Sequence, residues 1–172
     1  MQIQVQIKKI DEEAVIPQYA TRGSAGFDLV AHADRIILPG ETKLISTGLA
    51  FAIPAGYEMQ IRPRSGISLK TKLRLPNSPG TIDSDYRGEL YVMMENGNVP
   101  TGNSGSPLDV SHQPIEGTER YPEGTYIIRR GDRIAQGVIA QVEQAQFVAV
   151  KQLDETIRGT GGFGHTGTAV ID

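Results

Sequence analysis

Apolar residues in this chain recur at every second position over several short stretches, and this alternation limits the fold more than any other feature. The stretches 49–53, 57–61 and 90–94 alternate in this way, which is typical of strands with one buried face. Apolar residues at helical spacing are almost absent. Pairs that favour turns separate the stretches, at Pro39-Gly40, Pro54 to Gly56, Pro79-Gly80, Asn96-Gly97 and Gly131-Asp132. We therefore predict an all-β domain built as a sandwich, a jelly roll or a barrel.

The length and composition exclude several classes of protein. The chain has 172 residues, which suits one domain, and a net charge of -3, so we expect no direct binding to nucleic acid. It has no cysteine, which excludes disulfides and thiolate metal ligands. No apolar run approaches the roughly 18 residues that span a bilayer. The alternating start, Met1 to Ile10, is typical of a strand and not of a signal peptide. We expect a soluble, cytoplasmic protein that binds no membrane.

One short helix is predicted, starting near Ser65 and continuing to Lys70, with Ser65 in position to cap its first turn. Arg64, Ser65 and Gly66 combine a bidentate phosphate donor, a hydroxyl and a residue small enough for close approach to the backbone. Two interpretations of these three residues stay open at this point. They form either a phosphate site or an ordinary helix start.

The densest polar cluster is the segment 83–87, which reads Asp-Ser-Asp-Tyr-Arg. If the segment is extended, its three charged residues lie on one side and Ser84 and Tyr86 on the other. A carboxylate on the side that faces a cleft could take a proton from water. The alternative, on these residues alone, is a solvated turn with an acidic edge.

Two stretches break the strand pattern. Residues 97–124 are rich in Gly, Pro, Ser, Thr and Asn, and a connection of this length in a β domain is usually functional or disordered. The tail from Arg158 to Gly167 contains five glycines, too little side-chain area to hold it in place. We therefore divide the chain into a β domain at 1–157, with an insertion at 97–124, and a flexible C-terminal arm at 158–172.

Five short motifs, taken in order along the chain, resemble those of the trimeric deoxyuridine triphosphatase (dUTPase) family. They are Ser24 to Leu29, Arg62 to Gly66, Asn77 to Gly88, Gly131 to Gln136 and Arg158 to Gly164. Any one of them could arise by chance, but five in register could not. The resemblance implies a jelly-roll-like, distorted β-barrel that forms a homotrimer and exchanges its C-terminal arm between chains. The long insertion is similar to those of phage-encoded members.

The resemblance also implies an activity, the Mg²⁺-dependent hydrolysis of dUTP to dUMP and pyrophosphate. Asp83 would be the general base that deprotonates the water attacking the α-phosphorus in line with the leaving pyrophosphate. Asp28 would hold Mg²⁺ through water. The implied phosphate contacts are Arg64, Ser65, Gly66 and Gln136, with Arg158, Gly164, His165 and Thr166 at the distal phosphate. At His165 many members of the family carry a serine.

The implied determinants of base and sugar lie mainly in the third motif. Asn77 and the nearby Gly80 and Thr81 would read the edge of uracil, because cytosine would leave buried polar groups unpaired. Tyr86 would pack against the deoxyribose and exclude a ribose hydroxyl. Phe163 would stack over the uracil ring.

Two alternatives belong beside this interpretation. A dCTP deaminase shares the phosphate-binding half of the fold, but its relatives carry a catalytic glutamate five residues after the glycine that matches Gly88, where this chain has Met93. The second alternative is a nucleotide-gated regulator that binds a repressor protein through the insertion, with hydrolysis secondary. An apolar patch for such a partner would consist of Leu108, Val110, Ile115 and Tyr121. A tolerated surface insertion also stays open.

Overall fold

The computed structural model describes residues 3–163 and 165. Nearly all of its regular structure is strand. The elements are β1 (Gln6–Lys9), β2 (Phe27–Val30), β3 (Arg35–Ile37), β4 (Thr42–Ala52), β5 (Tyr57–Pro63), α1 (Ser65–Lys70), β6 (Leu73–Arg74), β7 (Gly80–Ile82), β8 (Glu89–Asn96), β9 (Ser104–Gly105), β10 (Tyr121–Pro122), β11 (Tyr126–Ile128) and β12 (Arg133–Gln141).

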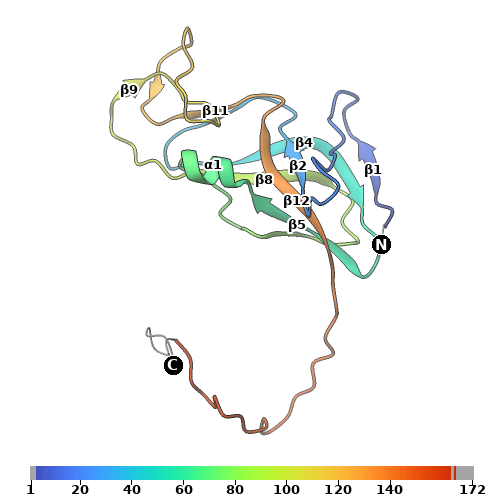
Figure 1. Cartoon of the computed structure of the whole chain (residues 1–172). Helices are drawn as coiled ribbons and strands as arrows, with labels where there is room; N and C mark the ends of the chain where they lie inside the picture. The colour runs from blue at the N-terminus through green and yellow to red at the C-terminus, as the bar shows by residue number, and fades with distance from the viewer. Residues whose placement is uncertain (1–2, 164, 166–172) are drawn as a thin grey trace.

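Two four-stranded antiparallel sheets form the body of the molecule (Figure 1). One has the strand order β1-β4-β8-β6, and the other has the order β2-β12-β5-β7. The pairs β11-β3 and β10-β9 complete the structure. Neighbouring strands in both large sheets come from distant parts of the sequence, as in jelly rolls. The prediction of an all-β, jelly-roll-like domain is confirmed.

The core lies between the two sheets and explains the alternation in the sequence. On β8, Leu90, Val92 and Met94 are at most 1% exposed, whereas the residues between them face outward. Met59 and Ile61 of β5, in the other sheet, belong to the same buried cluster. Burying each such side chain contributes about 1.5–3 kcal/mol, so this layer is the main source of stability.

The ladder between β4 and β8 is interrupted by a bulge. Its register shifts between Ser46 and Ala50, and Gly48 within the bulge has a φ of 68°. A Cβ at Gly48 would lie 2.8 Å from that of Ala14 and 3.0 Å from the ring of His32. The left-handed backbone and this close approach both require glycine.

The segment 97–124 is folded against the body. Leu108 forms backbone bridges to Pro114 and to Tyr126 at the start of β11. Leu108 and Val110 pack against the main core, and Ile115 is 7% exposed. Ile115 is therefore buried and not available to a partner, whereas Leu108 and Val110 are only partly buried and also pack against the core of the chain itself.

Two local predictions need correction. The N-cap of α1 is Arg64, without a side-chain capping bond, and Ser65 is the first helical residue. Pro79-Gly80 is not a turn, because Gly80 already begins β7 and pairs with Ile61 of β5. The strands predicted around 49–53, 57–61 and 90–94 are confirmed, within β4, β5 and β8.

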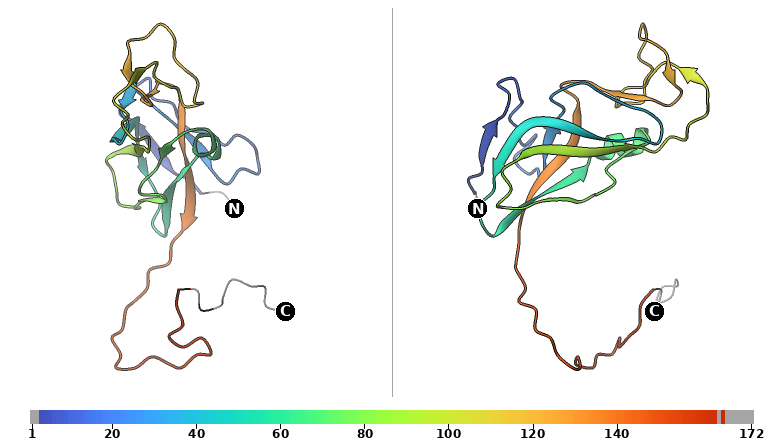
Figure 2. Two further views of the ribbon diagram at one scale, coloured as in Figure 1. Left: turned by 90° about the vertical axis from the view of Figure 1, so that its left-hand side faces the viewer. Right: turned by 180° about the vertical axis from the view of Figure 1, so that it is seen from behind.

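The chain leaves the body after β12 (Figures 1 and 2). Residues 143–163, called the arm segment below, are in no strand or helix, and nearly all of them are exposed. The departure comes earlier in the chain than the boundary expected between 157 and 158. The arm segment carries several strongly exposed apolar side chains, namely Phe147, Val148, Val150, Leu153, Ile157 and Phe163. Within the residues described, no helix is long and apolar enough to cross a membrane.

Candidate active site

Pairing in the second sheet brings together three of the predicted motifs. Gln136 in the middle strand β12 lies opposite Asp28 of β2 on one side and Arg62 of β5 on the other. Arg64 follows β5 directly, at the same end of the sheet. All of these residues are at least partly exposed, because the alternating positions, such as Phe27 and Leu29, point into the core.

Asp28 is the centre of a small charged cluster at this end. The Arg64 Nε donates to its Oδ1 at 2.9 Å, and the Arg133 Nη1 donates to its Oδ2 at 3.1 Å. Arg64 also donates from Nη1 to the carbonyl oxygen of Arg133 at 3.2 Å. The cluster therefore holds two guanidinium groups around one carboxylate, and its net positive charge suits a polyanion.

Arg133 is a member of this cluster that was not predicted from the sequence. It lies in the fourth motif, but nothing in its spacing indicates a contact with Asp28, which is 105 residues away. The register of β2 on β12 creates the contact, since Arg133 pairs with Val30 next to a register shift. The only feature of the sequence that could have indicated this role is that Arg133 is a charged residue within the fourth motif.

The start of α1 leaves room for a ligand beside this cluster. Ser65 and Gly66 are both exposed. Apart from its chain neighbours and the backbone of α1, no heavy atom lies within 4 Å of the position that a Cβ on Gly66 would occupy. A phosphate could therefore approach the backbone here without displacing protein atoms.

The described residues provide no complete metal site of their own. No group of three or more His, Cys, Asp or Glu side chains in the described part of the chain could hold a metal ion. Asp28 is the one predicted ligand, and each of its oxygens already accepts one hydrogen bond. A carboxylate oxygen has a second lone pair, so Asp28 can still accept from a metal-bound water. The residues present fit an ion whose direct ligands are water and substrate oxygens.

The second half of the third motif, residues 83–88, forms a turn at the other end of the sheet. Ser84 and Asp85 are turn residues, and the N–H of Tyr86 donates to the carbonyl oxygen of Asp83 at 3.2 Å. The segment is a turn, as in the second interpretation of these residues, and it is not extended, so the alternation expected of an extended segment does not apply. Asp83 is exposed, as a base that meets water must be.

Tyr86 folds back over the end of this turn. Its hydroxyl donates to the carbonyl oxygen of Glu89 at 2.9 Å. A Cβ on Gly88 would lie 2.4 Å from that hydroxyl oxygen, so a larger residue would displace the ring. Just before β7, the Asn77 amide lies 3.2 Å from the position that a Cβ on Gly80 would occupy, which brings these two predicted uracil contacts together.

Within one chain the two halves of the predicted site are far apart. Ile82 pairs with Met59 near the start of β5, so Asp83 lies beside that end of the strand. Arg64 lies just beyond the other end. At about 3.3 Å per residue the separation is about 20 Å, too far for one α-phosphate to reach both.

The described arm residues of the predicted site contact neither half. Among the described residues, Arg158 donates only to the carbonyl oxygen of Gly161, at 2.9 Å, and Phe163 is fully exposed. His165 is exposed as well. Gly164 and Thr166 lie outside the described residues.

Burial raises the pKa of Asp132 in the fourth motif, and the nearby carboxylates of Asp109 and Asp34 add to the increase. The Asp132 Oδ2 accepts a hydrogen bond from the N–H of Arg129 at 2.8 Å, which acts in the opposite direction. Asp132 thus serves the turn before β12 and is not directed at Asp28.

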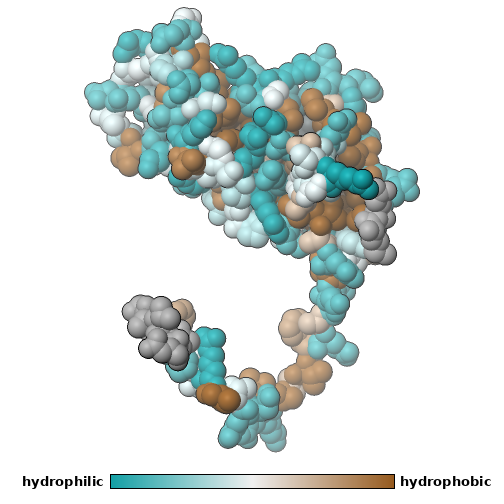
Figure 3. All heavy atoms as spheres, in the orientation of Figure 1, coloured by the Kyte–Doolittle hydropathy of each residue, from teal (hydrophilic) through white to brown (hydrophobic). Residues whose placement is uncertain are grey.

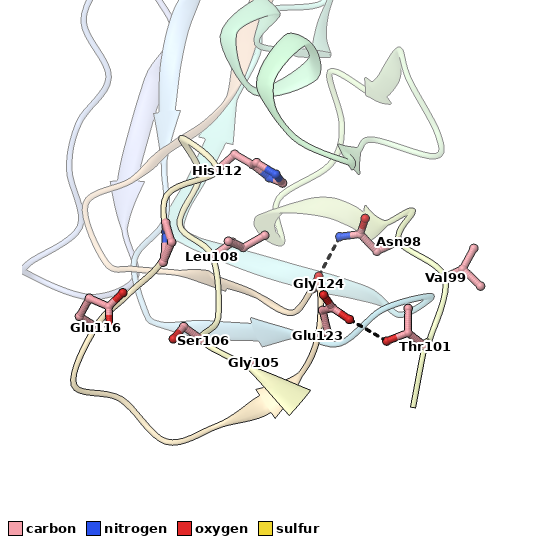
Figure 4. Close-up of a pocket in the computed structure, with 11 residues that line it drawn as sticks. Asn98, Val99, Thr101, Gly105, Ser106, Leu108, His112, Glu116, Glu123 and Gly124 are labelled. Carbon is pink, nitrogen blue, oxygen red and sulfur yellow. Dashed lines mark hydrogen bonds between the residues drawn. The ribbon is translucent and has the colours of Figure 1, made fainter. Parts of the chain in front are cut away.

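Two cavities lie outside the predicted substrate residues. One, of about 570 Å³, is in the segment 97–124 and is lined in part by Glu116, Glu123 and His112 (Figure 4). The other, of about 840 Å³, is lined mainly by apolar residues of β1, the segment 17–24 and neighbouring strands. Neither cavity is lined by Asp28, Arg64, Asp83 or Tyr86.

Comparison with known proteins gives a consistent result. A family model described as dUTPase matches residues 12–101 and 122–167. The deoxyuridine 5'-triphosphate nucleotidohydrolase of Nautilia profundicola is 47% identical over 165 residues, which cover 96% of this chain and 99% of the relative. That of Caulobacter vibrioides is 46% identical over 156 residues, covering 88% and 85%.

Solved structures of phage enzymes share the fold. The dUTPase of Staphylococcus bacteriophage 80alpha, solved with dUPNHPP, has a TM-score of 0.91 and 30% identity, covering 97% of this chain and 100% of that one. A point mutant of the dUTPase from phage phi11 of S. aureus has a TM-score of 0.84 and 28% identity, covering 89% and 100%. That structure is described as showing the coordination of a structural Mg(II) ion.

The two stretches matched by the family model contain all five motifs, and residues 102–121 between them fall inside the segment expected to be an insertion. Residues of the first four motifs lie in the second sheet, at the start of α1 and in the turn described above, and the fifth motif lies in the arm. The chain therefore belongs to the dUTPase family, enzymes that hydrolyse deoxyuridine 5'-triphosphate.

Proposed function

We propose that the chain hydrolyses dUTP to dUMP and pyrophosphate at a site assembled from three copies, with Asp83 of one copy acting on a triphosphate held by another. The observation that carries this proposal is the cluster of Arg64 and Arg133 on Asp28 together with its separation from Asp83. A cationic cluster and a carboxylate base are both needed, and one chain keeps them apart.

Arg64, Ser65, Gly66 and Gln136 bind the triphosphate in this proposal. Substrate oxygens would compete with Asp28 for the Arg64 guanidinium, which is only 25% exposed and already oriented. Because the guanidinium is held before substrate arrives, little side-chain freedom is lost on binding. Arg158, Gly164, His165 and Thr166 of the arm reach the distal phosphate when the arm closes.

Asp83 orients and deprotonates the attacking water, and the same motif selects the substrate. Its exposure allows water to approach, and the bond between Asp83 and Tyr86 closes the turn that carries both residues. Asn77, Gly80 and Thr81 read the uracil edge, and Tyr86 packs against the deoxyribose. Phe163 covers the base from the arm.

Mg²⁺ is the proposed cofactor, held by Asp28 through water. When bound, the ion neutralises charge on the triphosphate as the pyrophosphate departs. The spare lone pairs of the Asp28 carboxylate support this outer position. The two arginines hold that carboxylate in place.

Surface features support a homotrimer with exchanged arms. The arm segment exposes a series of apolar side chains, and the cavity of about 840 Å³ beside β1 is lined by Ile3, Val5 and Ile7. Figure 3 shows apolar residues both along the arm and beside the N-terminal end of the body. Two complementary apolar surfaces on one molecule favour insertion of the arm of one copy into the groove of the next.

The experiment is steady-state release of pyrophosphate with dUTP, dCTP, UTP and dTTP, with Mg²⁺ and then with excess chelator. We expect a metal-dependent preference for dUTP and loss of turnover in the chelator. A folded, assembled protein that turns over dUTP equally well without divalent metal would contradict the proposed role of Asp28.

A second function is a regulatory one, binding of a repressor protein at or near 97–124. One observation favours it, because residues 102–121 lie outside the family match and yet form an ordered surface with a cavity of about 570 Å³. The structure of the 80alpha enzyme is described in terms of phage dUTPases that control transfer of virulence genes.

Surface changes test this function better than a deletion, because removing the segment would uncover Tyr126 and the core beneath Leu108. Replacing the exposed Glu116 and Glu119 by lysine should leave dUTP hydrolysis unchanged and weaken binding of a repressor, measured by titration calorimetry. Unchanged binding in a variant that still assembles would place the interaction elsewhere.

A further inference from the structure

Glu89 begins β8 directly after the 83–88 turn, and its side chain is held from three directions. One carboxylate oxygen accepts hydrogen bonds from the Ser46 hydroxyl and from the N–H of Gly48, the latter at 3.0 Å. The other accepts from the Tyr91 hydroxyl at 2.6 Å. Burial raises the pKa of Glu89, but the bonds from Ser46, Tyr91 and Gly48 together lower it below its usual value.

These contacts lie at the bulge, where the backbone ladder between β4 and β8 is interrupted. Ser46 pairs with Tyr91 and Ala50 pairs with Glu89, so three residues of β4 lie opposite Leu90 alone. Regular pairing cannot fix the start of β8 at such a point. The Glu89 carboxylate replaces it, and the Thr47 hydroxyl adds a bond to the Leu90 carbonyl oxygen at 2.7 Å.

The main chain of the same residue anchors Tyr86. The Tyr86 hydroxyl donates to the Glu89 carbonyl oxygen at 2.9 Å, with its ring directly over Gly88. Tyr86 is otherwise 45% exposed, so this bond is the principal restraint on the outer end of the ring. The side chain of Glu89 thus fixes the backbone to which Tyr86 is attached.

We propose that Glu89 is a positioning residue that sets the orientation of Tyr86 and thereby the discrimination between deoxyribose and ribose substrates. The inference rests on the proposed contact of Tyr86 with the sugar. Glu89 itself touches no substrate group. Its neutral counterpart, glutamine, offers one acceptor oxygen and an amide group that would face hydroxyl and N–H donors, so the start of β8 would relax.

The experiment compares kcat/KM for dUTP and for UTP in Glu89→Gln. We expect the ratio of the two values to fall roughly tenfold, as the loss of a hydrogen-bonded charge predicts. Ser46→Ala removes one of the three donors and should shift the ratio less, in the same direction. Glu95→Gln, the same change of charge at the far end of β8, should leave the ratio unchanged.

A double variant separates positioning from a general effect on stability. Tyr86→Phe breaks the bond to the Glu89 carbonyl oxygen, so adding Glu89→Gln to it should lower the ratio little further. If the double variant lowers the ratio by the full product of the two single effects, the inference is overturned, because Glu89 would then act independently of the Tyr86 hydrogen bond.

These experiments also distinguish a failure of the proposed role of Glu89 from a failure of the proposed contact between Tyr86 and the sugar. A normal ratio in assembled Glu89→Gln, with a reduced ratio in Tyr86→Ala, overturns the inference alone. A normal ratio in Tyr86→Ala overturns the proposed sugar contact and the inference with it. If Glu89→Gln does not fold, Ser46→Ala decides, and an unchanged ratio in that variant overturns the inference.

Discussion

Gly137, in the middle of β12, lies under the ring of Phe27, and a Cβ at this position would come within 2.4 Å of that ring. Phe27 is 7% exposed, so its ring would have to shift within a packed region to make room. We predict that Gly137→Ala lowers the free energy of unfolding by about 1–3 kcal/mol. Urea denaturation measures this value. Gly23→Ala is the matched control, since Gly23 has no heavy atom near its Cβ position. Equal unfolding free energies for the two variants would contradict the close contact between Gly137 and the ring of Phe27.

Glu89 also makes stability depend on pH. Its pKa in the folded chain is lowered, so the ionised carboxylate contributes stability above the pKa of the unfolded chain, about 4.3. That contribution disappears as the pH falls through the lower, folded pKa. We predict that wild-type exceeds Glu89→Gln in unfolding free energy at pH 7 and that the difference shrinks below about pH 4. The Tyr91 hydroxyl, whose pKa Glu89 raises through their hydrogen bond, stays protonated throughout this pH range. A difference independent of pH would mean that the charge is irrelevant.

Asp83 gives the most direct prediction for catalysis at the scale of one residue. Asparagine keeps the size and the turn but cannot accept the proton from water. We expect Asp83→Asn to bind a non-hydrolysable dUTP analogue normally and to lose about 10²–10⁴-fold in kcat. Calorimetry and pyrophosphate release provide the two values. Near-normal turnover would show that another group is the base.

At the scale of the elements, α1 allows a test of whether Ser65 caps the helix or binds phosphate. Ser65 is the first helical residue and makes no capping bond, so Ser65→Ala should change the free energy of unfolding by less than about 0.5 kcal/mol. A capping serine would cost about 1 kcal/mol on removal. The same variant should raise the KM for dUTP, because Ser65 is proposed to bind phosphate. A loss of stability without any change in KM would mean that Ser65 caps the helix and does not bind phosphate.

The elements that the sequence predicted well are those determined by alternation. β4, β5 and β8 follow the period-two pattern because one face of each is buried. The errors occurred where local hydrogen bonds or distant packing decide the structure. The 83–88 turn is closed by a hydrogen bond within its own backbone. Leu108 of the insertion is held at the core by its backbone bridge to Tyr126. Arg133 joined Asp28 only through strand register, which no local pattern contains.

For the whole molecule, the separation of about 20 Å between Asp83 and Arg64 predicts complementation between chains. Asp83→Asn chains and Arg64→Ala chains should each be nearly inactive alone. Refolded together in equal amounts, they should regain activity, with about one quarter of the sites carrying both intact residues. Pyrophosphate release before and after mixing provides the test. No recovery in mixed assemblies would mean that one chain supplies both residues.

Because the arm segment extends away from the body, we expect enzymatic activity to appear later than folding of the individual chain. The core between the two sheets is complete without residues 143–163, so each chain can reach its folded body in a first-order process. In the proposed assembly, the site forms only when folded chains meet. Newly folded protein would therefore be stable before it is active, with a lag that shortens as the chain concentration rises.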